Sequence, residues 1–163
     1  MTPPLRCLRE QVSEATARRI VEQASGCTVH VERTLYYPYL WYRARYRLAT
    51  LFGRPRFETD CLVDARKGVV STADGFETRE LRPPPADVLG VCVDRTAAAA
   101  AAQRTLSHAL GRQHRSGAPL ELETDTAGTL YKRFWVMRCG EAGPRVLLDS
   151  TTGRFTALTP TGA

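Results

Sequence analysis

The sequence has 163 residues, the length of one ordinary domain or of two small ones that share a core. Its 43% hydrophobic and 25% charged residues are typical of a globular protein, which excludes disorder, a collagen-like repeat and a coiled coil as descriptions of the whole chain. The formal net charge is +6 at pH 7, and all 23 cationic residues except Lys67 and Lys132 are arginines. A GC-rich genome produces this bias without any functional cause, so only a local cluster of arginines indicates recognition of phosphate or carboxylate groups.

The first predicted element is a helix that begins near Leu5 and ends at Gly26. Apolar residues recur at helical spacing through this segment, with charged residues between them, and the prolines at 3–4 suit the entrance of a helix. Glycine commonly follows the last turn of a helix, so Gly26 marks its end. Alternating, aromatic or β-branched sequence then predicts strands at 28–33, 35–50, 57–64 and 69–71.

A short turn from Asp64 to Gly68 is expected to join the last two of these strands. The carboxylate of Asp64 suits hydrogen bonds from the backbone ahead of it, and Gly68 adopts the positive φ that closes a short hairpin. The turn therefore has a structural explanation in its two end residues.

The second half of the chain opens with a linker and a second predicted helix. Residues 82–93 contain three consecutive prolines, which favour a stiff extended linker, followed by a short segment that we expect to be buried. Asp94 or Thr96 is expected to cap a helix that runs through six consecutive alanines and ends at Gly111 or Gly117. Further strands are predicted at 120–124, 129–139, 145–149 and 154–158.

An internal repeat organises these elements. Three short stretches recur in the same order in both halves of the chain: 25–32 with 116–123, 34–36 with 129–131, and 62–68 with 147–153. Three matches in order indicate the duplication of one unit of a helix and three strands. The predicted fold is therefore α+β, with tandem units, antiparallel sheets, helices packed on one face and pseudo-twofold symmetry. The expected segments are a first repeat, a linker and a second repeat in one compact domain, at 1–81, 82–93 and 94–163.

The repeated unit resembles the PepSY repeat. Residues 14–17 of the first helix read Glu-Ala-Thr-Ala, and residues 149–153 match the Val-Asp-x-x-Thr-Gly pattern of the last PepSY hairpin, whereas residues 64–68 have Lys in place of Thr. PepSY-like proteins are mostly extracytoplasmic, and some inhibit peptidases or bind peptides and other protein surfaces. The resemblance implies a non-catalytic accessory role and transfers no site residues.

The distribution of apolar residues and cysteines predicts where the protein is found. No apolar run reaches the roughly 18 to 20 residues of a membrane span, and the N-terminal sequence lacks the apolar region of a signal peptide. We therefore expect a cytoplasmic protein without a membrane span. An odd number of scattered cysteines favours reduced, buried thiols over a disulfide framework. These residues are Cys7, Cys27, Cys61, Cys92 and Cys139.

No catalytic, cofactor or metal site is expected. His30, His108 and His114 occupy positions typical of surface residues, without a neighbouring nucleophile in the sequence. Asp64 and Asp149 are conceivable as an acid and base pair across the pseudo-twofold axis, but turn formation already accounts for both. Phosphate-binding, dinucleotide-binding, zinc-protease and serine-hydrolase motifs are absent from the sequence.

One predicted strand, at 36–48, differs from the rest of the chain. Its even positions are core-like, while its odd positions place a row of aromatic rings before a row of guanidinium groups. Between Thr28 and Phe57, six arginines stand against Glu32 alone, which gives this stretch +5 of the net +6. The predicted binding face consists of Tyr37, Tyr39, Trp41, Arg43, Arg45, Arg47, Arg54 and Arg56.

Several functions are compatible with this face. The leading hypothesis is a non-catalytic binding or assembly module that recognises a protein or anionic partner. The sequence does not determine the oligomeric state, and a homodimer is compatible with it. The second is a single-stranded nucleic-acid-binding protein, in which aromatic rings such as Trp41 and Tyr39 stack on bases and Arg43, Arg45 and Arg47 neutralise phosphates. A small-molecule enzyme with a cleft between the repeats is the third. The structural alternative is that helices cover the aromatic rings as core and the arginines form a solvated edge.

Overall fold

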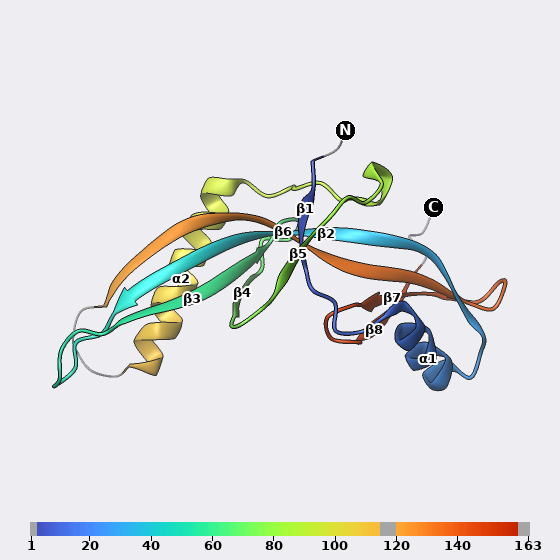
Figure 1. Ribbon diagram of the computed structural model, residues 1–163, viewed down its shortest axis with the longest axis horizontal. Coiled ribbons are helices and arrows are strands. Elements are labelled where there is room, and N and C mark those ends of the chain that lie inside the picture. The colour runs from blue at the N-terminus through green and yellow to red at the C-terminus, as the bar shows by residue number, and fades with distance from the viewer. Residues whose placement is uncertain (1–2, 115–119, 160–163) are drawn as a thin grey trace. The chain divides into compact units, whose positions relative to one another are not determined.

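The computed structural model of the protein describes residues 3–114 and 120–159, which form an α+β fold with two α-helices and a mixed sheet (Figure 1). The elements are β1 (Leu5–Leu8), α1 (Glu14–Ser25), β2 (Val29–Arg47), β3 (Arg56–Asp64), β4 (Val70–Ala73), β5 (Thr78–Leu81), the short 3-10 helix η1 (Pro85–Asp87), α2 (Arg95–Gln113), β6 (Glu121–Cys139), β7 (Arg145–Asp149) and β8 (Phe155–Leu158). The sheet has the order β4-β3-β2-β6-β1-β5, and β7 pairs with both β6 and β8. The predicted α+β class is confirmed, with one parallel pair, β1 with β6, among antiparallel ones.

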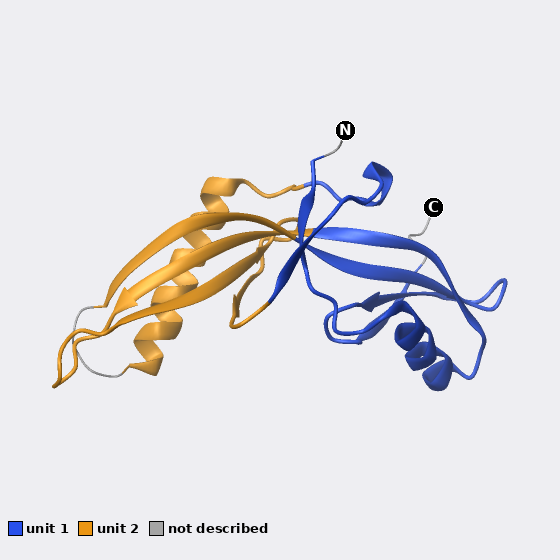
Figure 2. Cartoon of the chain, viewed as in Figure 1, with its two compact units in different colours: residues 1–37, 77–90, 131–163 blue, residues 38–76, 91–130 orange. Residues whose placement is uncertain are grey.

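Two compact units divide the chain, and neither is continuous in sequence (Figure 2). The first unit comprises 1–37, 77–90 and 131–163, and the second comprises 38–76 and 91–130. The long strands β2 and β6 each contribute residues to both units. The predicted segments, at 1–81, 82–93 and 94–163, are continuous in sequence, whereas each unit combines residues from several parts of the chain.

The core of the first unit lies between α1 and the strands β6 and β7. Ala17 and Val21 of the helix are fully buried against Trp135 and Leu148. The helix begins after Ser13, whose hydroxyl accepts a hydrogen bond from the Thr16 backbone N–H at 3.2 Å. Gly26, at φ 71°, ends it in the left-handed conformation, as predicted.

The core of the second unit lies between α2 and the strands β2 and β3. Ala98, Ala102 and Leu106 pack there with Leu40 and Tyr42 of β2. The alanines keep this helix face thin, which allows close packing on the sheet. Two predicted features are confirmed here: Asp94 is the N-cap of α2, and the even positions Leu40, Tyr42 and Ala44 of β2 lie in the core.

The structure corrects the predicted start of the first helix. Leu5–Leu8 forms the strand β1 between β5 and β6, and α1 begins only at Glu14. Helical spacing of apolar residues does not distinguish the two cases over so short a stretch, and Cys7 and Leu8 are buried by pairing of the strand. The strand β5 that pairs with it was not predicted.

Other boundaries are also corrected. Thr34 does not interrupt β2, and residues 125–128 do not interrupt β6, because pairing in the sheet extends each strand over two predicted ones. The helix α2 passes through Gly111, since one glycine costs only about 1 kcal/mol in a helix, and Gly117 lies outside the described residues. Residues 88–93 are half-buried or exposed rather than buried, because they run as an irregular connection.

The predicted Asp-x-x-x-Gly turns are confirmed in both places. The Asp64 carboxylate accepts hydrogen bonds from the backbone N–H groups of Arg66 and Lys67, each at 2.9 Å. The Asp149 carboxylate accepts one from the Thr151 backbone N–H at 2.8 Å. The glycine at each end has a positive φ, 75° at Gly68 and 72° at Gly153.

Replacement of Gly153 tests the second turn. Its φ is unfavourable for any side chain, and a Cβ atom there would lie 3.4 Å from methyl groups of both Ile20 and Val12. We expect Gly153→Ala to lower the free energy of unfolding by about 1 to 3 kcal/mol in urea denaturation. Gly68→Ala is the matched control, because its φ is similar and its nearest neighbour, Val93, is 3.8 Å away. A variant at 153 as stable as the wild type would contradict this turn geometry.

Candidate functional site

The outer face of β2, opposite to the core, carries most of the predicted binding residues. Trp41, Arg43, Arg45 and Arg47 alternate there with the core residues of the second unit. Tyr37 belongs to the first unit, where its ring contacts Phe134 edge-on at 6.0 Å between centroids. The other predicted residues, Tyr39, Trp41, Arg43, Arg45, Arg47, Arg54 and Arg56, belong to the second unit.

The aromatic part of this face is largely covered. Trp41 is only 8% exposed, and its ring contacts Phe76 edge-on at 5.4 Å between centroids. Its indole Nε1 donates a hydrogen bond to the Asp60 carboxylate at 2.8 Å, and the Arg43 guanidinium lies 5.1 Å from the ring centroid. Tyr39 is half-buried. Such rings present little free surface on which a base stacks.

The arginines meet carboxylates from the neighbouring strand β3. The antiparallel register places Arg43 opposite Asp60 and Arg45 opposite Glu58, and both pairs form ion pairs, at 3.3 and 3.7 Å. Arg45 forms another, at 2.7 Å, with Asp125 of β6. The two arginines are therefore neutralised by residues that lie outside the basic stretch of the sequence.

The next pair of the ladder differs from these two. Arg47 and Arg56 lie directly opposite each other, and both side chains are exposed. Within the described residues neither forms an ion pair. Like charges directly opposite each other destabilise a strand pair unless an anion lies between or beside them.

Carboxylates of β6 line a cavity beside this pair. Glu121 and Glu123 line a small cavity of about 90 Å³ together with Arg45, Arg47 and Arg56. Glu121 forms an ion pair with Arg54 at 3.6 Å, in which both side chains are more than 60% exposed. An exposed pair of this kind contributes little and exchanges readily with another anion.

The turn that joins β2 to β3 exposes two large apolar side chains that the sequence reading did not single out. Leu51 is 99% and Phe52 is 100% exposed. The backbone of Thr50 and Gly53 closes the turn with reciprocal N–H to C=O hydrogen bonds, at 2.8 and 3.3 Å, so Leu51 and Phe52 form its tip. The pair of adjacent apolar residues before a glycine was the only signal of this feature in the sequence. We call Arg47, Arg54 and Arg56 with Leu51 and Phe52 the hairpin end.

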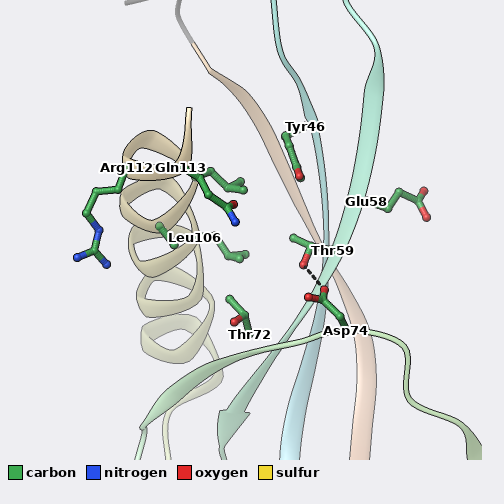
Figure 3. A pocket seen from close by; sticks show the side chains of 10 residues that line it. Tyr46, Glu58, Thr59, Thr72, Asp74, Leu106, Arg112 and Gln113 are labelled. Atoms are coloured by element: carbon green, nitrogen blue, oxygen red, sulfur yellow. Dashed lines mark hydrogen bonds between the residues drawn. The ribbon is translucent and has the colours of Figure 1, made fainter. Parts of the chain in front are cut away.

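A pocket of about 480 Å³ lies elsewhere in the second unit, between the C-terminal half of α2 and the strands β3 and β4 (Figure 3). Asp74 lines it, and its carboxylate accepts a hydrogen bond from the Thr59 hydroxyl at 3.1 Å. Glu58 also lines it, but its side chain points away from the helix and forms the ion pair with Arg45.

Two of the buried cysteines, Cys7 and Cys61, are protonated thiols at neutral pH. Burial raises the pKa of Cys7 and of Cys61 to about 11, so both stay protonated at pH 7. Cys139 is also buried, Cys27 is half-buried, and Cys92 is exposed, which corrects the expectation of buried thiols at that position. Within residues 3–114 and 120–159, no three side chains of His, Cys, Asp or Glu form a group that would hold a metal ion.

Comparison with known proteins adds no function to this geometry. No family model, curated protein or solved structure matches the chain. The resemblance to the PepSY repeat therefore stays a prediction. In the described part of the chain, no helix combines the length and the apolar character of a membrane span.

Proposed function

We propose that the protein is a non-catalytic binding module that contacts an anionic partner with the hairpin end. The observation that carries this proposal is the Arg47–Arg56 pair, which follows two ladder positions where an arginine faces a carboxylate. A bound anion would relieve the repulsion between the two guanidinium groups, and their planar donor arrays suit phosphate, sulfate or carboxylate oxygens.

Single-stranded nucleic acid is one anionic partner, but the geometry does not favour base stacking on this face. Base stacking requires an exposed Trp41 ring, but Trp41 is only 8% exposed. Phosphate binding along the strand requires Arg43 and Arg45 to be available. Both arginines form ion pairs with carboxylates of the same unit. We therefore propose anion recognition by the hairpin end rather than by the whole strand.

We also infer that the two units arose from one duplicated helix-plus-strand unit. Each combines one α-helix with parts of both long strands and one hairpin closed by an Asp-x-x-x-Gly turn. The two turns use the same hydrogen bonds, from backbone N–H groups to the aspartate and from the glycine N–H to the aspartate carbonyl at 2.8 Å. This supports the predicted duplication of a helix-plus-strand unit.

The anionic-partner proposal is tested with two variants of equal net charge. Arg47→Ala/Arg56→Ala removes the opposed pair, and Arg19→Ala/Arg104→Ala removes two exposed arginines from the helices α1 and α2. We expect the wild type to bind immobilised heparin and a fluorescent single-stranded oligonucleotide at 25 mM salt, with affinity that falls as salt rises. The hairpin variant is expected to lose about tenfold or more in affinity, since each hydrogen bond to a charged group contributes about 1.5 to 3 kcal/mol.

The control separates a specific site from net charge. Equal losses in both variants would mean that binding follows overall charge, and the proposal would be wrong. The proposal would also be wrong if the wild type bound neither heparin nor the oligonucleotide at low salt. Circular dichroism spectra and urea midpoints of both variants show whether each has kept its fold.

A further inference from the structure

We propose that the anionic partner is a phospholipid surface, and that Leu51 and Phe52 enter its headgroup region while the arginines of the hairpin end bind lipid phosphates. This inference rests on the proposed function and adds the class of partner. It describes attachment to a membrane surface, without any segment that crosses the membrane.

Two features of the tip point to an apolar environment beside the anions. Leu51 and Phe52 are 99% and 100% exposed, while most other large apolar side chains of the described residues are buried or partly covered. Large apolar side chains that gather at an exposed place mark sites of interaction with proteins or membranes. The hydrogen bonds between Thr50 and Gly53 fix this tip, so little conformational entropy is lost when it inserts.

The charges around the tip match an anionic lipid surface. From Arg47 to Phe57 the chain contains three arginines and no acidic residue. The carboxylates beside this segment come from β6, where Glu121 pairs with Arg54 at 3.6 Å and Glu123 lines the cavity with Arg47 and Arg56. A surface of phosphate groups above hydrocarbon offers oxygens to the arginines and an apolar layer to the tip in one place.

Other occupants satisfy only part of this arrangement. A nucleic acid or sulfated polysaccharide provides anions, but it leaves Leu51 and Phe52 in water unless bases stack on them. A second copy of the chain that met this one tip to tip would cover the apolar residues, but it would bring two sets of arginines together. The lipid surface is the partner that fits both the charge and the exposed apolar side chains.

The other long hairpin shows that an apolar tip is not a requirement of this fold. The connection between β6 and β7, residues 140–144, contains Glu141 and Ala142 at its exposed turn and no large apolar residue. It links a strand of the same length, 19 residues, to the strand that follows it. The exposed Leu51 and Phe52 therefore distinguish the β2–β3 hairpin from the β6–β7 hairpin.

Sedimentation with vesicles tests the proposal on the full chain. We expect binding to vesicles of phosphatidylcholine with 30% phosphatidylserine at 100 mM salt, and much weaker binding to phosphatidylcholine alone. Leu51→Ser/Phe52→Ser is expected to reduce the partition coefficient at least about tenfold, because the inserted apolar area is lost. Arg47→Ala/Arg56→Ala should reduce it roughly thirtyfold, because each basic residue near an anionic surface contributes about fivefold.

A fluorescence reporter and a matched variant separate insertion from simple attraction. Phe52→Trp should show a blue-shifted emission with the anionic vesicles and quenching by brominated acyl chains, after subtraction of the wild-type signal. Phe155→Ser/Leu158→Ser removes two apolar residues of β8 that are 39% and 38% exposed, and it should leave vesicle binding unchanged.

Different experimental results would contradict the lipid inference and the proposed anion binding. Binding to heparin that depends on Arg47 and Arg56, without vesicle binding, would overturn the lipid inference and leave the anion site standing. Vesicle binding that Leu51→Ser/Phe52→Ser retains would also overturn it, since attraction would then occur without insertion. A reporter signal that grows with protein concentration in the absence of vesicles would identify a second copy as the occupant and overturn it too. No binding to heparin or vesicles would contradict both proposals.

Discussion

Trp135→Ala is expected to lower the free energy of unfolding by about 3 to 5 kcal/mol, the range typical of an aromatic residue removed from a packed core. Trp135 is 1% exposed and is the largest of the fully buried side chains. It packs with Val21 of α1 and with Leu148 of β7, so its loss leaves a cavity between the helix and the sheet of the first unit. Urea denaturation at pH 7, followed by circular dichroism, measures the change.

Trp135→Phe is the control for this prediction. Within the described residues, the indole Nε1 of Trp135 is buried and donates to no acceptor. Removal of that N–H therefore breaks no protein hydrogen bond, and a phenylalanine keeps most of the buried ring. We expect a loss of about 1 to 2 kcal/mol, well below that of the alanine variant. Equal losses for the two variants would contradict the assignment of this stability to ring burial.

Asp149→Ala is expected to lower the free energy of unfolding by about 2 to 4 kcal/mol at pH 7, because it leaves Lys132 without its carboxylate. The two side chains form an ion pair in which Lys132 is 18% and Asp149 is 15% exposed. The carboxylate also accepts a hydrogen bond from the Thr151 hydroxyl at 2.7 Å, besides the one from the Thr151 backbone. Both contacts disappear in the variant, so the turn and the charge pair are lost together.

A double-mutant cycle isolates the charge pair from the turn. The cycle comprises Asp149→Ala, Lys132→Ala and the double variant, each measured by urea denaturation. Removal of either partner leaves a largely buried group without its counter-ion, and removal of both does not. The double variant should therefore lose less than the sum of the single variants. Strict additivity would show that the two side chains do not stabilise each other.

The pH dependence of this contribution follows from the lowered pKa of Asp149. Burial acts to raise the pKa, but hydrogen bonds from Lys132 and Thr151 outweigh it and hold the pKa below the ordinary value of 3.8. A carboxyl group with a lower pKa in the folded state stabilises the protein above its unfolded pKa. That stability is lost as the pH falls through the folded pKa. The wild type should thus lose its advantage over Asp149→Ala below about pH 4.

Local sequence features predicted the turns and the second helix well. Asp64 with Gly68, and Asp149 with Gly153, determine their turns through hydrogen bonds within five residues. The cap on Asp94 is likewise a local interaction. Such features depend on neighbours along the chain, so a single sequence is sufficient to identify them.

Features that depend on pairing between distant segments were not predictable in the same way. The four residues of β1 have helical spacing, and only their pairing with β5 and β6 makes them a strand. The net charge of the stretch from Thr28 to Phe57 suggested a continuous cationic face. The strand register, which a single sequence does not reveal, places Glu58 and Asp60 beside two of its arginines. The remaining opposed pair, Arg47 with Arg56, is a product of the same register.

The division of β2 and β6 between the two units has a consequence for the protein during its synthesis. The core of the second unit receives Leu106 from α2 and Leu122 from β6, and the core of the first unit receives Leu148 from β7. Neither core is complete until these later segments have left the ribosome, although domains commonly fold in order from the N-terminus. The apolar faces of α1 and β2 therefore stay exposed in the nascent chain until the strands β6 and β7 have been translated.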